Sequence, residues 1–255
     1  MTIALIAARG GSRRLPRKNI KSFCGIPLLA WSILQARSCK YIDECYVTTD
    51  DDEIEDIAVE YGAKVIRRPD WKDANEAAAN RPFIHAMKLL RERFGESFNE
   101  VLTILPTTPL NKPGDFDLGI EEYRKWGCDT IRPLRPMRET VILKKTHPRR
   151  CRTDLFDKGY KYLGEAGGWV VTSPDWYINF NSEFSDLDAD LNDMENWPAA
   201  ESYFFPVEYW QYADVDTLEE FEFAEVVMEH FILKGRRYDE VYKIIETKPL
   251  PFNGD

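Results

Sequence analysis

Short apolar runs alternate with longer amphipathic segments along the first half of the chain. The runs are rich in Val, Ile and Thr, which predicts strands, and the segments between them carry apolar residues at helical spacing. Strands are predicted over 2–7, 44–50, 63–69 and 99–110, and helices over 27–38, 51–62, 74–95 and 114–127. This order is typical of a parallel α/β sheet in which strands are buried on both faces and crossovers are helical.

From about residue 128 the rhythm changes to strand-like runs separated by Pro and paired charges. These runs cover 129–136, 139–147, 158–163 and 168–174. We interpret roughly 130–165 as an extended hairpin excursion from a single domain that spans 1–255. A last extended run, 202–217, is followed by an amphipathic helix over 218–235.

Composition narrows the class of protein. Of the 255 residues, 44% are apolar and 31% are charged, which is typical of a soluble globular protein. No apolar run reaches the ~20 residues of a membrane helix, so we expect no membrane partner and a cytoplasmic location. The net charge of −10 argues against general binding to nucleic acid. The five cysteines include no CxxC pair, so neither a disulfide framework nor a zinc site is indicated.

One loop has the opposite charge from the rest of the chain. The sequence AARGGSRRLPRKN, residues 7–19, follows the first predicted strand. Its two glycines allow backbone amides to approach an anion closely, and five cations accompany them: Arg9, Arg13, Arg14, Arg17 and Lys18. The pattern is neither GxGxxG nor GxxxxGK[ST]. The loop therefore predicts a polyphosphate site at the carboxyl edge of the sheet.

A pair of acids stands about two hundred residues later, in the sequence YADVDT. Asp214 and Asp216 are two positions apart in the predicted extended run, so they should point the same way and can share one Mg²⁺. Such pairs are also common in solvated turns, and Asp216 or Thr217 is a candidate cap of the last helix. A metal near the α-phosphate and the leaving pyrophosphate would neutralise charge during attack at phosphorus.

Five motifs together resemble a known family. IAARGGSRRLPRKN, VTTD, VIRRP, LPTTPL and ADVDT, in this order and at these spacings, resemble the acylneuraminate cytidylyltransferases. The resemblance implies a CTP-dependent, Mg²⁺-requiring transfer of CMP to an acidic sugar with release of pyrophosphate. It also implies a Rossmann-like α/β fold, with a mostly parallel sheet and helices on both faces. The region 135–148, RPMRETVILKKTHP, resembles the hairpin through which members of this family form homodimers.

The resemblance assigns roles to individual positions. The nucleotide-binding set is Ala8, Arg9, Gly10, Gly11, Ser12, Arg13, Lys18, Asn19 and Arg68, with Arg68 near the cytosine. The metal ligands are Asp214 and Asp216. We expect Arg9, Lys18 and Asp214 to be catalytic, because Arg9 and Lys18 would stabilise negative charge as the P–O bond breaks. For Arg68, the alternative is a surface position at a strand end.

Departures from the family pattern gather on the acceptor side. Leu105 stands where glutamine is usual, Asn111 replaces arginine and Asn75 replaces aspartate; Ala166 and Val170 replace asparagine and tyrosine. Each lost partner leaves a polar group of a sugar unsatisfied, at ~1–3 kcal/mol, so we predict an unusual acceptor. The candidate acceptor-binding residues are Asn75, Thr107, Asn111 and Gly167. Cations that are candidates for binding an acid, or for a hairpin facing solvent or a partner, are Arg132, Arg135, Arg138, Lys144, Lys145 and Arg149.

Four functions remain open at this point. The leading one is a cytidylyltransferase for a nonulosonic or 3-deoxy-2-ulosonic acid. The others are a cytidylyltransferase for a phosphonate or another small acid, a glycosyltransferase with a metal-binding acid pair, and a CTP-binding relative without catalysis. The three histidines, His85, His147 and His230, show no metal or dyad spacing.

Overall fold

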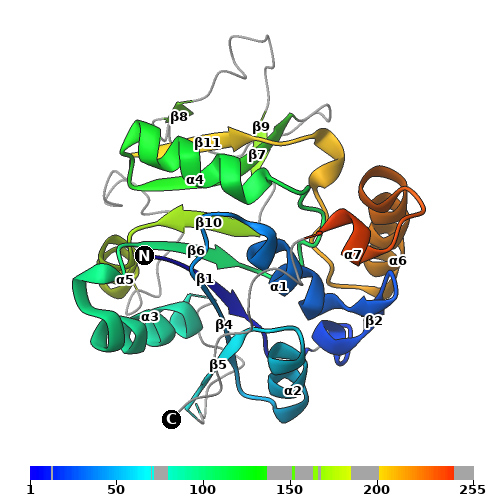
Figure 1. Ribbon diagram of the computed structural model, residues 1–255, viewed down its shortest axis with the longest axis horizontal. Coiled ribbons are helices and arrows are strands. Elements are labelled where there is room, and N and C mark those ends of the chain that lie inside the picture. The colour runs from blue at the N-terminus through cyan, green and yellow to red at the C-terminus, as the bar shows by residue number, and fades with distance from the viewer. Residues whose placement is uncertain are drawn as a thin grey trace.

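The computed structural model describes residues 1–12, 14–69, 71, 80–136, 151–152, 163–165, 168–184 and 201–243. Within these ranges, nine strands form one sheet in the order β5, β4, β1, β6, β10, β7, β11 and β8, and β9 pairs with β7 (Figure 1). Their bounds are Lys64–Arg67 (β5), Glu44–Thr49 (β4), Thr2–Ala7 (β1), Glu100–Ile104 (β6), Trp169–Thr172 (β10), Thr130–Pro136 (β7), Ser202–Pro206 (β11), Cys151–Arg152 (β8) and Leu163–Glu165 (β9).

Most of these strands are parallel. β5, β4, β1 and β6 form one parallel group, and β7, β11 and β8 form a second. β10 lies between the two groups and is antiparallel to both β6 and β7. β9 is antiparallel to β7. The expectation of a mostly parallel sheet is confirmed.

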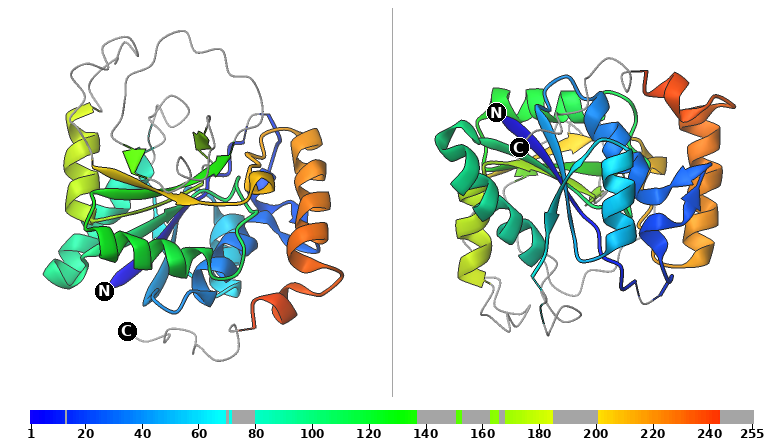
Figure 2. Two further views of the ribbon diagram at one scale, coloured as in Figure 1. Left: turned by 90° about the horizontal axis from the view of Figure 1, so that it is seen from above. Right: turned by 60° about the horizontal axis from the view of Figure 1, so that its bottom comes forward.

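Helices cover both faces of the sheet, as Figure 2 shows from two further directions. The helices are α1 (Leu28–Ser38), α2 (Asp52–Glu60), α3 (Arg81–Phe94), α4 (Asp115–Trp126), α5 (Pro174–Phe184), α6 (Leu218–Val227) and α7 (Tyr238–Val241). Ala4 and Ile6 of β1 are buried against residues of α1 and α4, whereas Ile3 and Leu5 are buried against α3 and α5. Successive side chains of a strand point to opposite faces of the sheet, so a strand that is covered by helices on both faces has all of these side chains buried.

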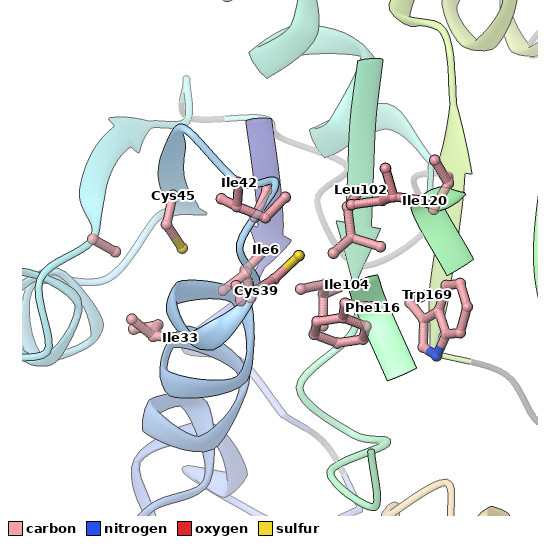
Figure 3. Packing of buried hydrophobic residues seen from close by; sticks show 14 of the residues in the cluster. Ile6, Ile33, Cys39, Ile42, Cys45, Leu102, Ile104, Phe116, Ile120 and Trp169 are labelled. Atoms are coloured by element: carbon pink, nitrogen blue, oxygen red, sulfur yellow. The ribbon is translucent and has the colours of Figure 1, made fainter. Parts of the chain in front are cut away.

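One core layer fixes the relation between α1, α4 and the sheet. Ile6 and Ile33 belong to the same buried cluster as Phe116 and Trp169 (Figure 3). The rings of Phe116 and Trp169 meet edge to face, with centroids 5.7 Å apart. A Cβ atom at Gly119 of α4 would overlap the Trp169 ring, so glycine lets the helix approach β10 closely.

A second cluster lies at one end of the sheet and supports the predicted site. α6 packs beside α1 and the short hairpin β2 (Ser22–Phe23) and β3 (Ile26–Pro27), with Phe23 and Phe221 edge to face at 5.2 Å. Leu15, between the cations of the basic loop, is buried in this cluster together with Val215. Apolar burial therefore ties residues 8–19 to the segment that carries the two acids.

Several element bounds differ from the sequence predictions. The extended run predicted over 202–217 is wrong as a strand beyond Pro206, because Tyr209–Gln211 forms a 3₁₀ turn after β11. The last helix switches after Val227 to a π-helical turn over Met228–Leu233. α5 was not predicted.

The predicted hairpin region enters the sheet at its start. Residues 130–136 are strand β7, which lies between β10 and β11. Residues 137–150 and 153–162 lie outside the described residues. The hairpin over 130–165 and the single-domain organisation of 1–255 therefore stay predictions. Among the helices that are described, none has the length and apolar character needed to cross a membrane.

Candidate active site

The carboxyl ends of four parallel strands meet at one edge of the sheet. The first residues beyond β1, β4, β5 and β6 are Ala8, Asp50, Arg68 and Leu105. β10 runs the other way, so its amino end lies at this edge, and the Gly168 carbonyl accepts a hydrogen bond from Leu105 N at 2.6 Å. Ligands of open α/β sheets bind outside this edge.

The loop after β1 is held in place by hydrogen bonds. Gly10 N donates to Asp50 Oδ1 at 3.1 Å, and Ser12 N donates to the Gly10 carbonyl at 3.1 Å. Asn19 is buried, and its Nδ2 donates to the Arg9 carbonyl at 3.0 Å. The Arg9 side chain itself is exposed at the edge. The loop is therefore held both by its own polar groups and by Asp50, and Arg9 is an exposed cation at the edge.

Arg17 has a different place from the one that sequence reasoning gave it. Its backbone is left-handed, with φ 57°, and its guanidinium pairs with Asp51 and with Glu53, the latter at 3.0 Å. Asp51 also caps α2, because its Oδ1 accepts from Ile54 N at 3.1 Å. The Arg17 hydrogen bond holds the pKa of Asp51 below its usual value. Arg17 thus fastens the end of the loop to α2.

Lys18 joins the basic loop to the acid pair. Its side chain is only 8% exposed, and Nζ donates to the Val215 carbonyl and to Asp216 Oδ1, at 2.5 and 2.8 Å. Arg14 lies 2.5 Å from Asp216 Oδ2 through Nη2. Residues almost two hundred positions apart in the sequence therefore meet, as we expected for two sites at one sheet edge.

Asp214 and Asp216 lie in an extended segment outside the sheet. Val215 N donates to the Thr107 carbonyl at 2.8 Å, and Val215 is buried between the exposed Asp214 and the half-buried Asp216. The two carboxylates therefore share a side, although the predicted strand does not extend to them. Thr217, one of the two predicted caps, forms a capping box with Glu220 at the start of α6.

The donor set of this pair fits Mg²⁺. Carboxylate oxygens are the protein ligands that Mg²⁺ prefers, and it usually takes one or two of them together with substrate phosphates and water. The described residues contain no group of three or more His, Cys, Asp or Glu side chains that could hold a metal. Two carboxylates next to a cationic loop suit a metal that arrives with phosphate oxygens.

Arg68 is placed by the strand that precedes it. Its N donates to the Thr49 carbonyl at 2.8 Å, and its Nη2 donates to the Thr48 carbonyl at 2.7 Å. Burial lowers the pKa of Arg68 to about 10, with Asp50 opposing the shift and the charge of Arg9 adding to it. Arg68 is therefore partly buried, and it is close enough to Arg9 of the basic loop for the charge of Arg9 to act on it.

The predicted acceptor residues have different surroundings. The Thr107 side chain is half-buried at the edge. Asn111 is buried, and its Nδ2 donates to the Thr108 carbonyl and to Gln35 Oε1 at 3.1 and 3.2 Å. The Asn111 carbonyl accepts from the Tyr242 hydroxyl at 2.9 Å. These bonds give Asn111 a structural role beneath the edge, which argues against the acceptor contact predicted for it.

Of the other predicted positions, some lie among the described residues and some lie outside them. Leu105 is 38% exposed at the carboxyl end of β6, and Val170 is half-buried in β10. The Arg135 guanidinium lies over the Tyr212 ring, 4.3 Å from its centroid, and Arg132 is also in β7. The predicted positions outside the described residues are Arg13, Asn75, Arg138, Lys144, Lys145, His147, Arg149, Ala166 and Gly167.

Sequence reasoning missed three features of this site. Asp50 accepts a hydrogen bond from Gly10 N of the basic loop, Asp51 pairs with Arg17 of the same loop, and Arg14 forms an ion pair with Asp216. Asp50 ends a predicted strand and Asp51 follows it directly, and this was the available signal, because strand ends meet at the ligand edge. Nothing in the sequence indicates which acid Arg14 contacts.

The structure places the described histidines and cysteines in packing roles. His85 meets the Trp71 ring edge to face, with centroids 5.7 Å apart, and His230 meets Phe231 at 4.6 Å. Burial, together with the charge of Arg68, lowers the pKa of His85. Cys24, Cys39, Cys45 and Cys128 are present as thiols.

The fold belongs to a recognisable class, the Rossmann-like α/β fold with a mostly parallel sheet. The solved structure of CMP:2-keto-3-deoxy-manno-octonic acid synthetase complexed with CTP superposes with a TM-score of 0.67 at 18% identity, over 90% of this chain and 98% of that one. The 4-diphosphocytidyl-2C-methyl-D-erythritol synthase of Anaerococcus prevotii gives a TM-score of 0.65 at 16% identity, over 89% and 98%. At these identities the likeness shows the fold alone.

Sequence comparison identifies the family. Residues 3–88 match the profile described as Cytidylyltransferase. A Campylobacter jejuni protein named pseudaminic acid cytidylyltransferase is 36% identical over 244 residues, which cover 88% of this chain and 95% of the relative. The chain belongs to the acylneuraminate cytidylyltransferase family and is a nucleotidyltransferase.

Two further relatives are matched over part of their length. N-acylneuraminate cytidylyltransferase B of Danio rerio is 52% identical over 221 residues, 78% of this chain and 50% of the relative. CMP-N,N'-diacetyllegionaminic acid synthase of Legionella pneumophila is 35% identical over 132 residues, 51% of this chain and 56% of the relative. The matches thus span about half the length of these two relatives.

Proposed function

We propose that this protein transfers CMP from CTP to an acidic sugar of the nonulosonic or 3-deoxy-2-ulosonic class. The observation that carries the proposal is the contact of Lys18 with Asp216, which joins a cationic loop to an acid pair at the carboxyl edge of the sheet. The printed names of the relatives support it, because they are synthases or cytidylyltransferases of such acids.

In the proposed reaction, a hydroxyl oxygen of the acceptor forms a bond to the α-phosphorus of CTP. The bond from the α-phosphorus to the bridging oxygen breaks, pyrophosphate leaves with the electron pair, and the hydroxyl proton passes to solvent or to a base. Arg9 and Lys18 stabilise the charge that grows on the phosphate oxygens. Arg68 faces the nucleotide base. The backbone of Gly11, which is exposed, lies along the triphosphate, next to Ser12.

Asp214 and Asp216 would hold Mg²⁺ beside these groups. When bound, the metal neutralises phosphate charge and favours departure of pyrophosphate. The two carboxylates suit this role because they face the same side of a segment anchored by Val215. The protein residues themselves orient the triphosphate.

The acceptor is proposed to differ from sialic acid itself. Leu105, 38% exposed at the end of β6, presents an apolar surface where the resemblance leads us to expect a polar one. We further propose that the enzyme is a cytoplasmic homodimer.

The experiment is a mass-spectrometric search for a CMP-linked product. The protein is incubated with CTP, Mg²⁺ and pooled nonulosonic acids, ulosonic acids and phosphonates, and pyrophosphate is measured in parallel. A CMP adduct of an acidic sugar supports the proposal, and an adduct of a phosphonate alone would replace it with the small-acid alternative. Bound CTP with no product from any acid would indicate a binding protein without catalysis.

Variants test the named roles. Arg9→Ala and Asp214→Asn should each lower kcat about 100-fold or more, because each removes charge that is expected to act on the reacting phosphates. Arg67→Ala is the matched control, since Arg67 is the exposed neighbour of Arg68 and pairs with Asp52 and Glu55 on α2. Wild-type turnover in either site variant would contradict the mechanism.

A further inference from the structure

Asp216 is held by two cations of the phosphate loop, whereas Asp214 is not. Arg14 Nη2 lies 2.5 Å from Oδ2 of Asp216, and Lys18 Nζ lies 2.8 Å from Oδ1. Each carboxylate oxygen of Asp216 thus has its own positive partner. Within the ranges that the structure describes, Asp214 has no ion pair, and it is exposed on the same side of the segment. The two acids of one proposed metal site therefore start from different electrostatic states.

The two cations differ in burial. The Lys18 side chain is 8% exposed, and its ammonium is surrounded by the Val215 carbonyl and Asp216. A buried ammonium needs an anion within contact distance, because leaving it uncompensated costs several kcal/mol. Arg14 is 70% exposed, so water screens its attraction to Asp216. Lys18 is the strong counter-ion and Arg14 the weak one.

We propose that Lys18 and Arg14 act as exchangeable counter-ions that keep Asp216 from binding a divalent cation until a triphosphate is present. The inference rests on the proposed function. Without nucleotide, Asp216 neutralises the two cations, and a metal would have to displace them. Phosphate oxygens supply a second source of negative charge for Lys18 and Arg14, which frees Asp216 for the metal.

The consequence is a thermodynamic coupling between metal and nucleotide. Asp214 alone is a weak site, because a single exposed carboxylate is a poor ligand for a divalent cation. Nucleotide should therefore raise metal affinity, and the metal should raise nucleotide affinity by the same factor. The metal enters the site together with the triphosphate or after it.

The test is a titration of the full chain with Mn²⁺, followed by electron paramagnetic resonance of the free ion, with and without CTP, after subtraction of the Mn²⁺ that CTP binds in a protein-free titration. Wild-type protein should bind Mn²⁺ at least about tenfold more weakly without CTP, within the range of typical coupling energies. Without CTP, Arg14→Ala should bind Mn²⁺ about two- to fivefold more tightly than wild type. Without CTP, Lys18→Met should bind Mn²⁺ about tenfold or more tightly than wild type, because the charge of Lys18 is less screened by water. Arg67→Ala, which removes an arginine that pairs with α2, should match the wild type.

Two results would overturn the inference. One is equal Mn²⁺ affinity in wild-type protein with and without CTP, and the other is Arg14→Ala behaving as the wild type without nucleotide. Since Arg14 is exposed, this variant keeps the test decisive even where Lys18→Met fails to fold. CTP turnover and CTP binding, measured on the same wild-type sample, separate this inference from the proposed function. Normal turnover together with tight Mn²⁺ binding in the absence of CTP removes only the counter-ion role of Lys18 and Arg14. A wild-type protein that binds no CTP removes both the counter-ion role and the proposed function.

Discussion

Gly10 lies against the carboxylate of Asp51, and a Cβ atom at this position would overlap Oδ2. The carboxylate has little room to yield, because it is bound by Arg17 and by Ile54 N. Gly10→Ala should therefore lower the free energy of unfolding by about 1–3 kcal/mol, as overpacking does. Urea denaturation of the ligand-free protein measures the change.

Gly11 provides the matched control for this prediction. A Cβ atom at Gly11 would meet no heavy atom within 4 Å. Gly11→Ala should change the free energy of unfolding by no more than about 0.5 kcal/mol. Equal destabilisation by the two substitutions would mean that the loop needs glycine for backbone freedom and not for its approach to Asp51.

Individual site residues could be predicted from the sequence where chain order alone determines their position. Arg68 directly follows β5, and Arg9 and Lys18 lie in the loop after β1. The order of the strands in the sequence indicated the carboxyl edge of the sheet for all three residues, and they lie at this edge. Asn111 could not be placed in this way. Its hydrogen bonds to Gln35 and from Tyr242 connect residues far apart in the sequence, and no periodicity indicates such a network.

At the level of elements, the phosphate loop and α2 are joined by the pair of Arg17 with Asp51. Asp51→Asn keeps an oxygen that can cap α2 but removes the charge, so only the ion pair is lost. Since Arg17 is partly exposed, the cost at pH 7 should be about 0.5–1 kcal/mol. Asp52→Asn, at the next position of the same helix, is the control, because Asp52 is highly exposed and pairs only with Arg67 among the described residues.

The pH dependence of this difference has a definite sign. Arg17 lowers the pKa of Asp51 in the folded protein relative to the unfolded chain. The stabilisation is therefore complete above the unfolded value of about 3.9 and is lost as the pH falls through the lower folded value. Urea denaturation from pH 7 downward should show the wild type and Asp51→Asn converging below about pH 4. A gap that stays constant into acid would assign the effect to the cap.

Most helices and strands of the first half were predictable, and those of the second half less so. Between Thr2 and Trp126, strands and helices alternate with clear caps and turn residues, such as Gly62 with φ 83° after α2. β11 ends at Pro206 although the predicted run continues to residue 217, because Tyr209–Gln211 forms a 3₁₀ turn, and the buried residues 213 and 215 lie in an extended segment that pairs with no strand among the described residues. An alternating pattern indicates one buried side, and it does not indicate a neighbouring strand.

At the scale of the whole molecule, charge is divided unevenly along the chain. Residues 130–165 contain ten Lys or Arg and four Asp or Glu, which gives this segment a formal charge of +6. The total is −10, so the rest of the chain carries −16. Two copies can reduce their mutual repulsion if the basic segment of each one contacts the acidic body of the other. This distribution gives the proposed homodimer an electrostatic basis that can be measured.

The expected outcome is a dimer that weakens as salt is added. Sedimentation equilibrium in 0.1 M NaCl should give twice the chain mass, and the dissociation constant should rise about tenfold or more by 0.5 M NaCl, where the Debye length falls well below its ~10 Å at 0.1 M. Arg149→Glu combined with Lys145→Glu should weaken the dimer in low salt. Lys40→Glu with Lys125→Glu, at exposed positions after α1 and in the last turn of α4, should not. A salt-independent dimer would point to an apolar interface, and a monomer at every concentration would exclude the dimer altogether.

Association of two chains that each carry a charge of −10 is opposed at long range. Only a local match of opposite charges or buried apolar area can therefore hold the two chains together, and the salt dependence of the dissociation constant distinguishes these two forces.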